Sequence, residues 1–198
     1  DQNQIAQNAK TWVNLHLVYT HGFGVVMSPV NSVTSEGLPN FFIKDIPPVY
    51  TVDESTLKIS GPQIYYGEKY NEFVLVNTKA NEFDYPKGNK NKYINYDGSG
   101  GVNINSFFKK ILMAIRFGDI KLMLSSDINY DSKIMFDRNI QERISKITPF
   151  LKLDGDPYLV IDNEKLFWIQ DAYTVSGNFP YSERYGPINY IRNSIKIV

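Results

Sequence analysis

The chain has 198 residues, of which 42% are hydrophobic and 21% charged, a composition that supports one buried core and excludes a disordered segment. Lys plus Arg and Asp plus Glu both number 21, so there is no positive excess of the kind that binds nucleic acid, and we expect no nucleic-acid partner. The absence of cysteine excludes disulfides, thiolate catalysis and cysteine-bound metals.

The first half of the chain is predicted to consist of short elements separated by loops. Apolar residues at helical spacing predict a helix from Ile5 to His16, and the β-branched run that follows predicts a strand from Leu17 to Met27. Ile64–Tyr66 and Phe73–Asn77 are predicted to be short strands. The proline and lysines of Tyr85–Asn95 indicate a polar surface loop.

The clearest helix signal runs from Ser106 to Phe117, with Gly118 suited to end it. An apolar stripe at helical spacing is expected to face the core and consists of Phe108, Ile111, Leu112 and Ile115. The basic side chains on the same helix are expected to face water and are Lys109, Lys110 and Arg116. A second helix is predicted from Arg138 to Leu151, with Asp137 as its cap.

The last part of the chain is predicted to be a β-hairpin followed by one more strand. Tyr158–Ile161 and Leu166–Ile169 flank a polar turn, and a final strand begins at about Tyr190. These elements together predict an α+β fold, with a mainly antiparallel sheet and two or three helices packed on it. Because no repeat or linker interrupts the chain, we expect a single domain over residues 1–198.

Local motifs favour structural roles over chemistry. A hydrogen bond beside Gly22 explains His21 more simply than metal ligation does. The glycine-rich run 97–101 lacks the lysine and the spacing of a phosphate-binding loop, so it is more simply a turn. Aromatic residues beside carboxylates suit sugar binding or a glycosidase, and equally a core edged by tyrosine hydroxyls. We therefore assign no catalytic residue, no metal ligand and no cofactor.

Ordered strings of unusual residues run through the chain from Tyr19 onward. In chain order they include Tyr19–Asn31, Glu36–Pro39, Phe42–Pro48, Ile64–Glu68, Glu82–Pro86, Arg116–Asp119, Asp156–Tyr158, Trp168–Thr174 and Asn189–Ser194. On these strings the chain resembles the uncharacterised protein family 0182, large prokaryotic proteins with several transmembrane helices ahead of a long extracytoplasmic region. The resemblance implies a fragment, cut at both ends, on the extracytoplasmic side of the cell membrane. It carries over no functional residue.

Three functional hypotheses are compatible with the sequence. The first is a non-catalytic module that binds an envelope glycan, a peptide or other segments of a membrane-embedded parent protein. Its candidate ligand-binding residues are His21, Asp45, Tyr66, Glu68, Asp84 and Asp171. The second is an envelope hydrolase that acts on glycan or peptide through two of those carboxylates together with His21. The third is a module that completes a transporter or channel and would expose a large apolar patch.

Overall fold

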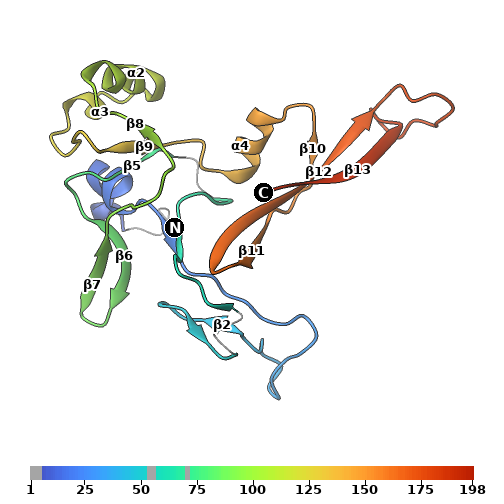
Figure 1. The fold of residues 1–198 in the computed structure, drawn as a ribbon, viewed down its shortest axis with the longest axis horizontal. Helices are drawn as coiled ribbons and strands as arrows, with labels where there is room; N and C mark the ends of the chain where they lie inside the picture. The colour runs from blue at the N-terminus through green and yellow to red at the C-terminus, as the bar shows by residue number, and fades with distance from the viewer. Residues whose placement is uncertain (1–5, 53–56, 70–71) are drawn as a thin grey trace.

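The computed structural model describes residues 6–52, 57–69 and 72–198 as an elongated molecule with several projecting parts (Figure 1). Its helical segments are η2 (Gln7–Ala9), η3 (Asn14–Val18), α2 (Phe107–Phe117), α3 (Lys121–Leu124) and α4 (Ile140–Ile147). Its strands are β1 (Gly22–Phe23), β2 (Ile43–Lys44), β3 (Val49–Tyr50), β4 (Gln63–Ile64), β5 (Val74–Val76), β6 (Glu82–Lys87), β7 (Lys90–Ile94), β8 (Val102–Asn103), β9 (Lys133–Met135), β10 (Lys152–Leu153), β11 (Tyr158–Asp162), β12 (Lys165–Ser176) and β13 (Tyr190–Ile197).

These strands pair antiparallel, which confirms the predicted α+β fold with a mainly antiparallel sheet. One sheet has the order β5–β9–β8. A second has the order β10–β12–β11, with β13 also paired to β12. Two-stranded pairs β1–β4, β2–β3 and β6–β7 complete the arrangement.

The centre of the core is β5, whose three residues are fully buried. Because successive side chains of a strand point to opposite faces, Leu75 packs in one apolar cluster while Val74 and Val76 pack in another. The first cluster extends to Leu17, Ile134 and the inner side of α2. The second is lined by aromatic side chains, Tyr65, Tyr66 and Tyr96.

Helix α2 has the predicted ends but not the predicted orientation. The Ser106 hydroxyl accepts a hydrogen bond from the Lys109 amide, and Gly118 ends the helix at a φ of 65°. The stripe that was expected to face the core is largely exposed instead, with Phe108 67% and Ile115 74% accessible. The core contacts come from the other side, through Met113, Ala114 and Phe117. The prediction failed because both sides of this helix are apolar.

The N-terminal prediction is right only in part over the described residues. Helical turns are present at 7–9 and 12–18 in place of one continuous helix from Ile5 to His16, and Ile5 itself lies outside the described residues. The predicted strand from Leu17 to Met27 is wrong, because only Gly22–Phe23 is strand. A tertiary contact explains the change. The His16 ring lies 2.8 Å from the Phe73 carbonyl oxygen through Nδ1 and stacks on the Phe73 ring at 4.2 Å.

Two further predictions need correction. Tyr85–Asn95 is not a loop, because β6 and β7 pair as a hairpin in which Gly88 takes a φ of 59° at the turn. The second predicted helix is shorter, and its cap is Asn139, whose side-chain oxygen accepts from the Glu142 amide, rather than Asp137. The predicted hairpin of β11 with β12 and the final strand β13 are confirmed.

Two parts of the molecule project from the core. The arm, defined as residues 174–192, is the end of the β12–β13 ribbon and extends away from the body at the upper right of Figure 1. The lobe, defined as residues 26–49, carries β2 and lies at the bottom of the same view. Both expose large apolar side chains, among them Tyr181 and Tyr185 in the arm and Val30 and Val33 in the lobe.

A matched pair of substitutions tests which side of α2 faces the core. We expect Ile134→Ala, at a fully buried position in β9, to lower the free energy of unfolding by about 2–5 kcal/mol through lost burial and a residual cavity. Ile115→Ala removes the same atoms from an exposed position and should cost under about 0.5 kcal/mol. Urea denaturation of both variants measures the difference. Equal losses would contradict the outward orientation of α2.

Candidate functional site

The candidate site is a cluster of buried polar side chains built around β6. Glu82 and Asp84 lie two residues apart on this strand, so their side chains point to the same face. That face turns inward, and the intervening Phe83 points the other way, toward the rings of Tyr19 and Tyr93. The alternation of polar and aromatic residues in β6 therefore delivers two carboxylates to the interior.

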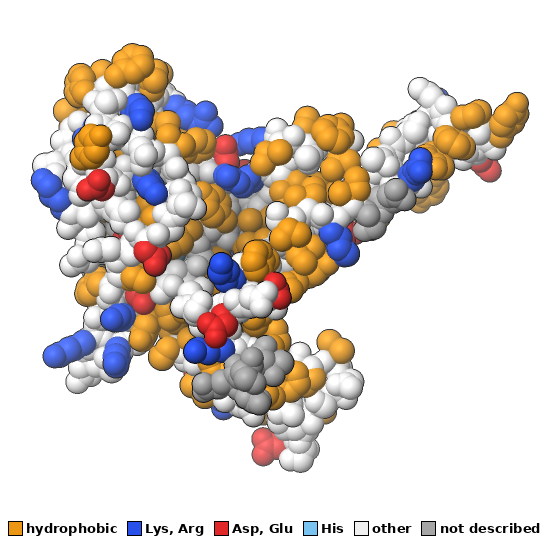
Figure 2. Space-filling view, viewed as in Figure 1, with side chains coloured by type: hydrophobic (Ala, Val, Ile, Leu, Met, Phe, Trp, Pro, Cys, Tyr) orange, Lys and Arg blue, Asp and Glu red, His pale blue; other side chains and the backbone are white. Residues whose placement is uncertain are grey.

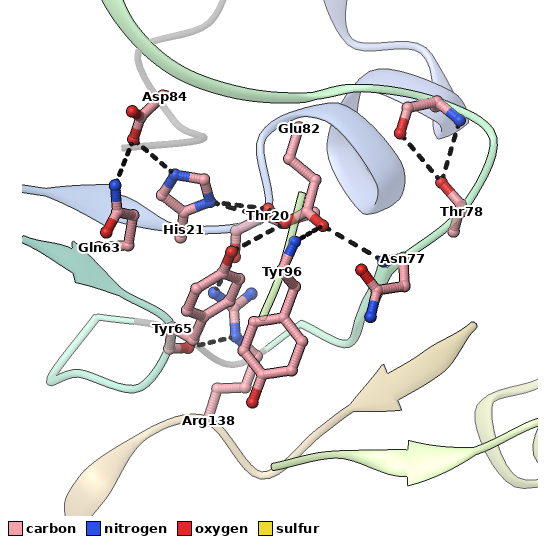
Figure 3. Close-up of polar contacts among 11 residues, drawn as sticks. Thr20, His21, Gln63, Tyr65, Asn77, Thr78, Glu82, Asp84, Tyr96 and Arg138 are labelled. Atoms are coloured by element: carbon pink, nitrogen blue, oxygen red, sulfur yellow. Dashed lines mark hydrogen bonds and ion pairs between the residues drawn. The ribbon is translucent and has the colours of Figure 1, made fainter. Parts of the chain in front are cut away.

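Glu82 is the best-connected member of the cluster (Figure 3). One of its oxygens accepts hydrogen bonds from the hydroxyls of Thr20, at 2.6 Å, and Tyr65, at 3.0 Å. The other accepts from the backbone amides of Asn77, at 3.3 Å, and Tyr96, at 3.2 Å. The carboxylate thus receives donors from four separate segments, which is what a buried ionised group requires.

His21 lies between the two carboxylates. Its Nδ1 is 2.9 Å from the Thr20 hydroxyl oxygen and 3.8 Å from Glu82, and its Nε2 is 3.3 Å from Asp84. Because the Thr20 hydroxyl gives its hydrogen to Glu82, both ring nitrogens face acceptors when both carboxylates are ionised. Gln63, brought opposite Phe23 by the β1–β4 pairing, donates to the same Asp84 oxygen at 3.0 Å.

Arg138 holds the backbone beneath this cluster. Its side chain is 1% exposed and donates to the carbonyl oxygens of Tyr65, at 2.7 Å, and Thr20, at 2.5 Å. These are the two residues whose hydroxyls bind Glu82. We call the set Thr20, His21, Gln63, Tyr65, Glu82, Asp84, Tyr96 and Arg138 the Glu82 network.

The pKa values in the network follow from burial and hydrogen bonding. Burial by itself raises the pKa of Glu82, but hydrogen bonds from His21, Thr20, Tyr65 and the Asn77 amide outweigh it and lower that pKa below 4.5. Burial, followed by the neighbouring Glu82 charge, raises the pKa of Tyr65 far above 10.0. The network therefore holds an ionised glutamate beside a neutral tyrosine.

Thr20, His21 and Asp84 repeat the order of nucleophile, base and orienting acid found in hydrolases, but two features oppose catalysis. The Thr20 hydroxyl donates to Glu82, so its hydrogen does not point at the His21 base. The side chains of His21, Glu82 and Asp84 are 0%, 1% and 4% exposed, so all three are closed to solvent in this structure. The arrangement is that of a structural network that holds five segments together.

The structure brings together only part of the predicted site. Of the six candidates, His21 and Asp84 are in contact, and Tyr66 lies nearby in the cluster beside β5. Asp45 is exposed in the turn between β2 and β3, and Glu68 is exposed in a turn where its carbonyl accepts from the Asn139 side chain. Asp171 lies on β12 and forms an ion pair with Lys196 at 2.7 Å.

Sequence reasoning missed most of the Glu82 network. Glu82, Thr20, Tyr65 and Arg138 were not proposed, although Glu82-Phe83-Asp84-Tyr85 carries the alternation of an amphipathic strand. Within the described residues, no group of three or more histidine, aspartate or glutamate side chains is arranged to hold a metal ion. The same described ranges contain no helix long and apolar enough to span a bilayer.

A hollow of about 290 Å³ lies elsewhere, at the base of the arm. Its lining residues are Lys152, Leu153, Asp154, Gly155, Tyr173 and Ile191. The Tyr173 hydroxyl donates to Asp154 at 3.3 Å, and the charge of that carboxylate raises the pKa of Tyr173. The lining holds one carboxylate, so it does not provide the pair that a glycosidase needs.

The fold and the network define an α+β chain that corresponds to one part of a larger protein. All of it, residues 1–198, matches the uncharacterised protein family UPF0182, and the chain belongs to that family. It is 54% identical over 200 residues to a UPF0182 protein of Desulforamulus reducens, with 100% of this chain and 21% of that protein covered.

Two clostridial relatives give the same result. The chain is 56% identical over 193 residues to a UPF0182 protein of Clostridium botulinum strain Hall, covering 98% of this chain and 21% of that protein. It is 55% identical over 199 residues to one from Clostridium novyi, covering 100% and 22%. The chain thus spans about a fifth of the length of the curated relatives it matches. No solved structure matches it.

Removing the Glu82 charge tests the structural role of the network. We expect Glu82→Gln to lower the free energy of unfolding by about 3–5 kcal/mol at pH 7. Each Glu82 oxygen accepts from two donors, so the NH₂ group of the glutamine would face two donors in either orientation of its side chain. The folded pKa of Glu82 lies below 4.5. Its contribution is therefore complete above that value and is lost as the pH falls through the folded pKa. Urea titrations at pH 7 and at low pH should show a shrinking difference between variant and wild type.

The exposed carboxylate of Glu183 supplies the control, because Glu183→Gln should change stability by no more than about 0.5 kcal/mol. If Glu82→Gln does not fold, Tyr65→Phe removes a single bond to the same carboxylate and should cost about 1–2 kcal/mol. A deficit for Glu82→Gln that stays constant with pH would contradict the assignment.

Proposed function

We propose that this chain is a non-catalytic assembly module on the extracytoplasmic side of a membrane-embedded parent protein. Its partners are then other segments of that parent or an envelope glycan or peptide. The closed Glu82 network supports a structural rather than catalytic use of the buried histidine and carboxylates. The outward-facing apolar side chains support a module that is completed by contacts beyond itself.

The observation that carries this proposal is the amount of exposed surface. The accessible surface is 12865 Å², whereas a compact monomer of 22.8 kDa exposes roughly 9,600 Å². The excess of roughly 3,000 Å² is of the size that permanent interfaces bury. Since the relatives are about five times as long as this chain, the remaining length of such a protein is ample to cover that surface.

The arm is the part most in need of a partner. Beyond the pairing of β10 with Ala172 and Tyr173 of β12, the ribbon has only two strands within the described residues. An isolated two-stranded ribbon is marginally stable in water. Phe179 stacks on Tyr190 at 4.0 Å, whereas Tyr181 and Tyr185 are almost wholly exposed. Aromatic side chains of this kind are favoured anchors of protein interfaces.

The hydrolase hypothesis is less well supported. Its five residues are distributed over separate elements, and the one pair in contact, His21 with Asp84, is buried. A hydrolase needs its acid and base to meet at an open surface. We therefore favour the assembly module over the hydrolase.

The extracytoplasmic location can be tested by thiol labelling, because the chain contains no cysteine. In the longer protein that carries this chain, Asn89→Cys at the exposed β6–β7 turn should react with a membrane-impermeant maleimide in intact cells. The control Ser132→Cys, at a buried position, should react only after denaturation. Labelling of Asn89→Cys that requires prior lysis would place the chain inside the cell and refute the location.

Hydrogen exchange tests the assembly role separately. We expect the amides of residues 177–189 to exchange rapidly in the isolated chain and at least about tenfold more slowly within the longer protein, because the arm becomes covered there. The amides of β5 should exchange slowly in both, since that strand is buried within this chain. Equal exchange of the arm in the two samples would show that nothing covers it.

A further inference from the structure

One exposed surface differs from the arm and the lobe in its charge. We define the α2 face as the exposed apolar side chains of α2 and the segment after it: Phe107, Phe108, Leu112, Ile115, Ile120 and Leu124, each 48–74% accessible. Figure 2 shows apolar side chains gathered at the end of the molecule where Figure 1 places α2, with Lys and Arg side chains beside them.

The charges around the α2 face have one dominant sign. Between Ser106 and Leu124 the chain has four basic residues, Lys109, Lys110, Arg116 and Lys121, and one acidic residue, Asp119. The Asp119 carboxylate is occupied by the indole of Trp12 and the amide of Lys121. The segment is cationic although the whole chain has no net charge. Two of its cations are already engaged, because Arg116 forms an ion pair with Asp137 at 3.6 Å and the Lys110 ammonium donates to the Ile128 carbonyl oxygen.

The positions of the basic residues favour an anionic lipid surface over a protein partner. Successive residues of a helix are rotated by 100° about its axis. In a projection down the axis of α2, Leu112 lies at one edge of the exposed apolar arc, and Arg116 and Lys109 are the next two residues beyond it. Apolar residues that include phenylalanine, bordered by lysine and arginine, are typical of helices that lie in the plane of a membrane interface. The apolar centre of a protein interface, in contrast, is depleted of lysine.

We propose that the α2 face docks on the surface of an anionic lipid bilayer. The apolar side chains enter the boundary between headgroups and acyl chains, and the lysine stems extend outward so that their ammonium groups meet lipid phosphates. The inner side of α2 stays packed on the core through Met113 and Phe117. The helix can therefore bind without the rest of the fold rearranging.

This inference goes beyond the proposed function, because vesicle binding by the chain needs neither a membrane anchor nor the rest of the longer protein. Thiol labelling in cells therefore tests the proposed location, and vesicle binding in solution tests the lipid site separately. A negative vesicle result would leave the extracytoplasmic location intact, and labelling only after lysis would leave the lipid site intact.

Flotation of the chain with vesicles tests the proposal. We expect it to float with vesicles that contain phosphatidylglycerol, more weakly at high salt, and poorly with phosphatidylcholine alone. Phe108→Ser with Ile115→Ser should lower binding at least roughly tenfold. Lys109→Gln and Lys121→Gln should lower it roughly fivefold for each charge.

Matched control variants distinguish binding through the α2 face from nonspecific adsorption to vesicles. Val30→Ser with Tyr181→Ser removes equally exposed apolar groups from the lobe and the arm, and Lys87→Gln with Lys90→Gln removes two lysines from the β6–β7 turn. These variants should float like wild type. All variants should keep the wild-type unfolding midpoint to within a few degrees, because every substituted side chain except the half-buried Lys109, which donates to Asn105, is exposed.

A fluorescence measurement guards against variants that fail to fold. Phe108→Trp should shift its emission to shorter wavelength when phosphatidylglycerol vesicles are added, whereas Tyr181→Trp should not. Three results would overturn the proposal: no flotation of wild type, equal loss in the control variants, or self-association of the chain that depends on Phe108 and Ile115 in the absence of lipid. The last result would assign the α2 face to a second copy.

Discussion

The buried carboxylate of Glu82 is the interaction on which the rest of the structure depends. Its four donors come from the link between η3 and β1, the residue after β4, the residue after β5 and the segment after β7. Each of those segments is short and carries few pairing hydrogen bonds of its own. A buried charge with fewer donors would be strongly unfavourable, so the requirement to satisfy Glu82 fixes where the N-terminal segment and the β6–β7 hairpin lie relative to β5.

The network and the apolar core support one another across β5. Val74 and Val76 present one side of the strand to Tyr65 and Tyr96, whose polar groups reach Glu82, while Leu75 presents the other side to η3 and α2. Arg138 ties the network to the backbone, because its guanidinium donates to the carbonyl oxygens of Tyr65 and Thr20. Such fully bonded polar groups make a core specific as well as stable, because few other arrangements satisfy them. This explains a rigid centre within a chain whose outer parts are thinly packed.

Sequence patterns predicted the elements whose signals are local. Ser106 and Gly118 bound α2 through contacts within one turn, and the β11–β12 hairpin depends on a polar turn that includes Asn163 and Glu164 at positive φ. Other features depend on distant partners. Thr20 and Glu82 are 62 residues apart, so nothing near either residue indicates that they meet. The orientation of α2 was also beyond prediction, because Met113 and Phe117 compete with Phe108 and Ile115 for the core, and a periodicity of apolar residues cannot choose between two apolar sides.

The exposed apolar surfaces surround a well-ordered centre and are not a sign of weak folding of this chain. A chain that folded poorly would leave many polar groups unpaired, whereas Gln170 Oε1 is the single buried side-chain atom without a hydrogen bond among the described residues, and β5 is inaccessible to solvent. The three uncovered surfaces also differ in chemistry: tyrosines on the arm, aliphatic side chains on the lobe, and phenylalanines bordered by lysine on the α2 face. Surfaces with different chemistry suit different partners. A single core thus positions three exposed surfaces of different chemistry, and its buried histidine and carboxylates are hydrogen-bonded within that core.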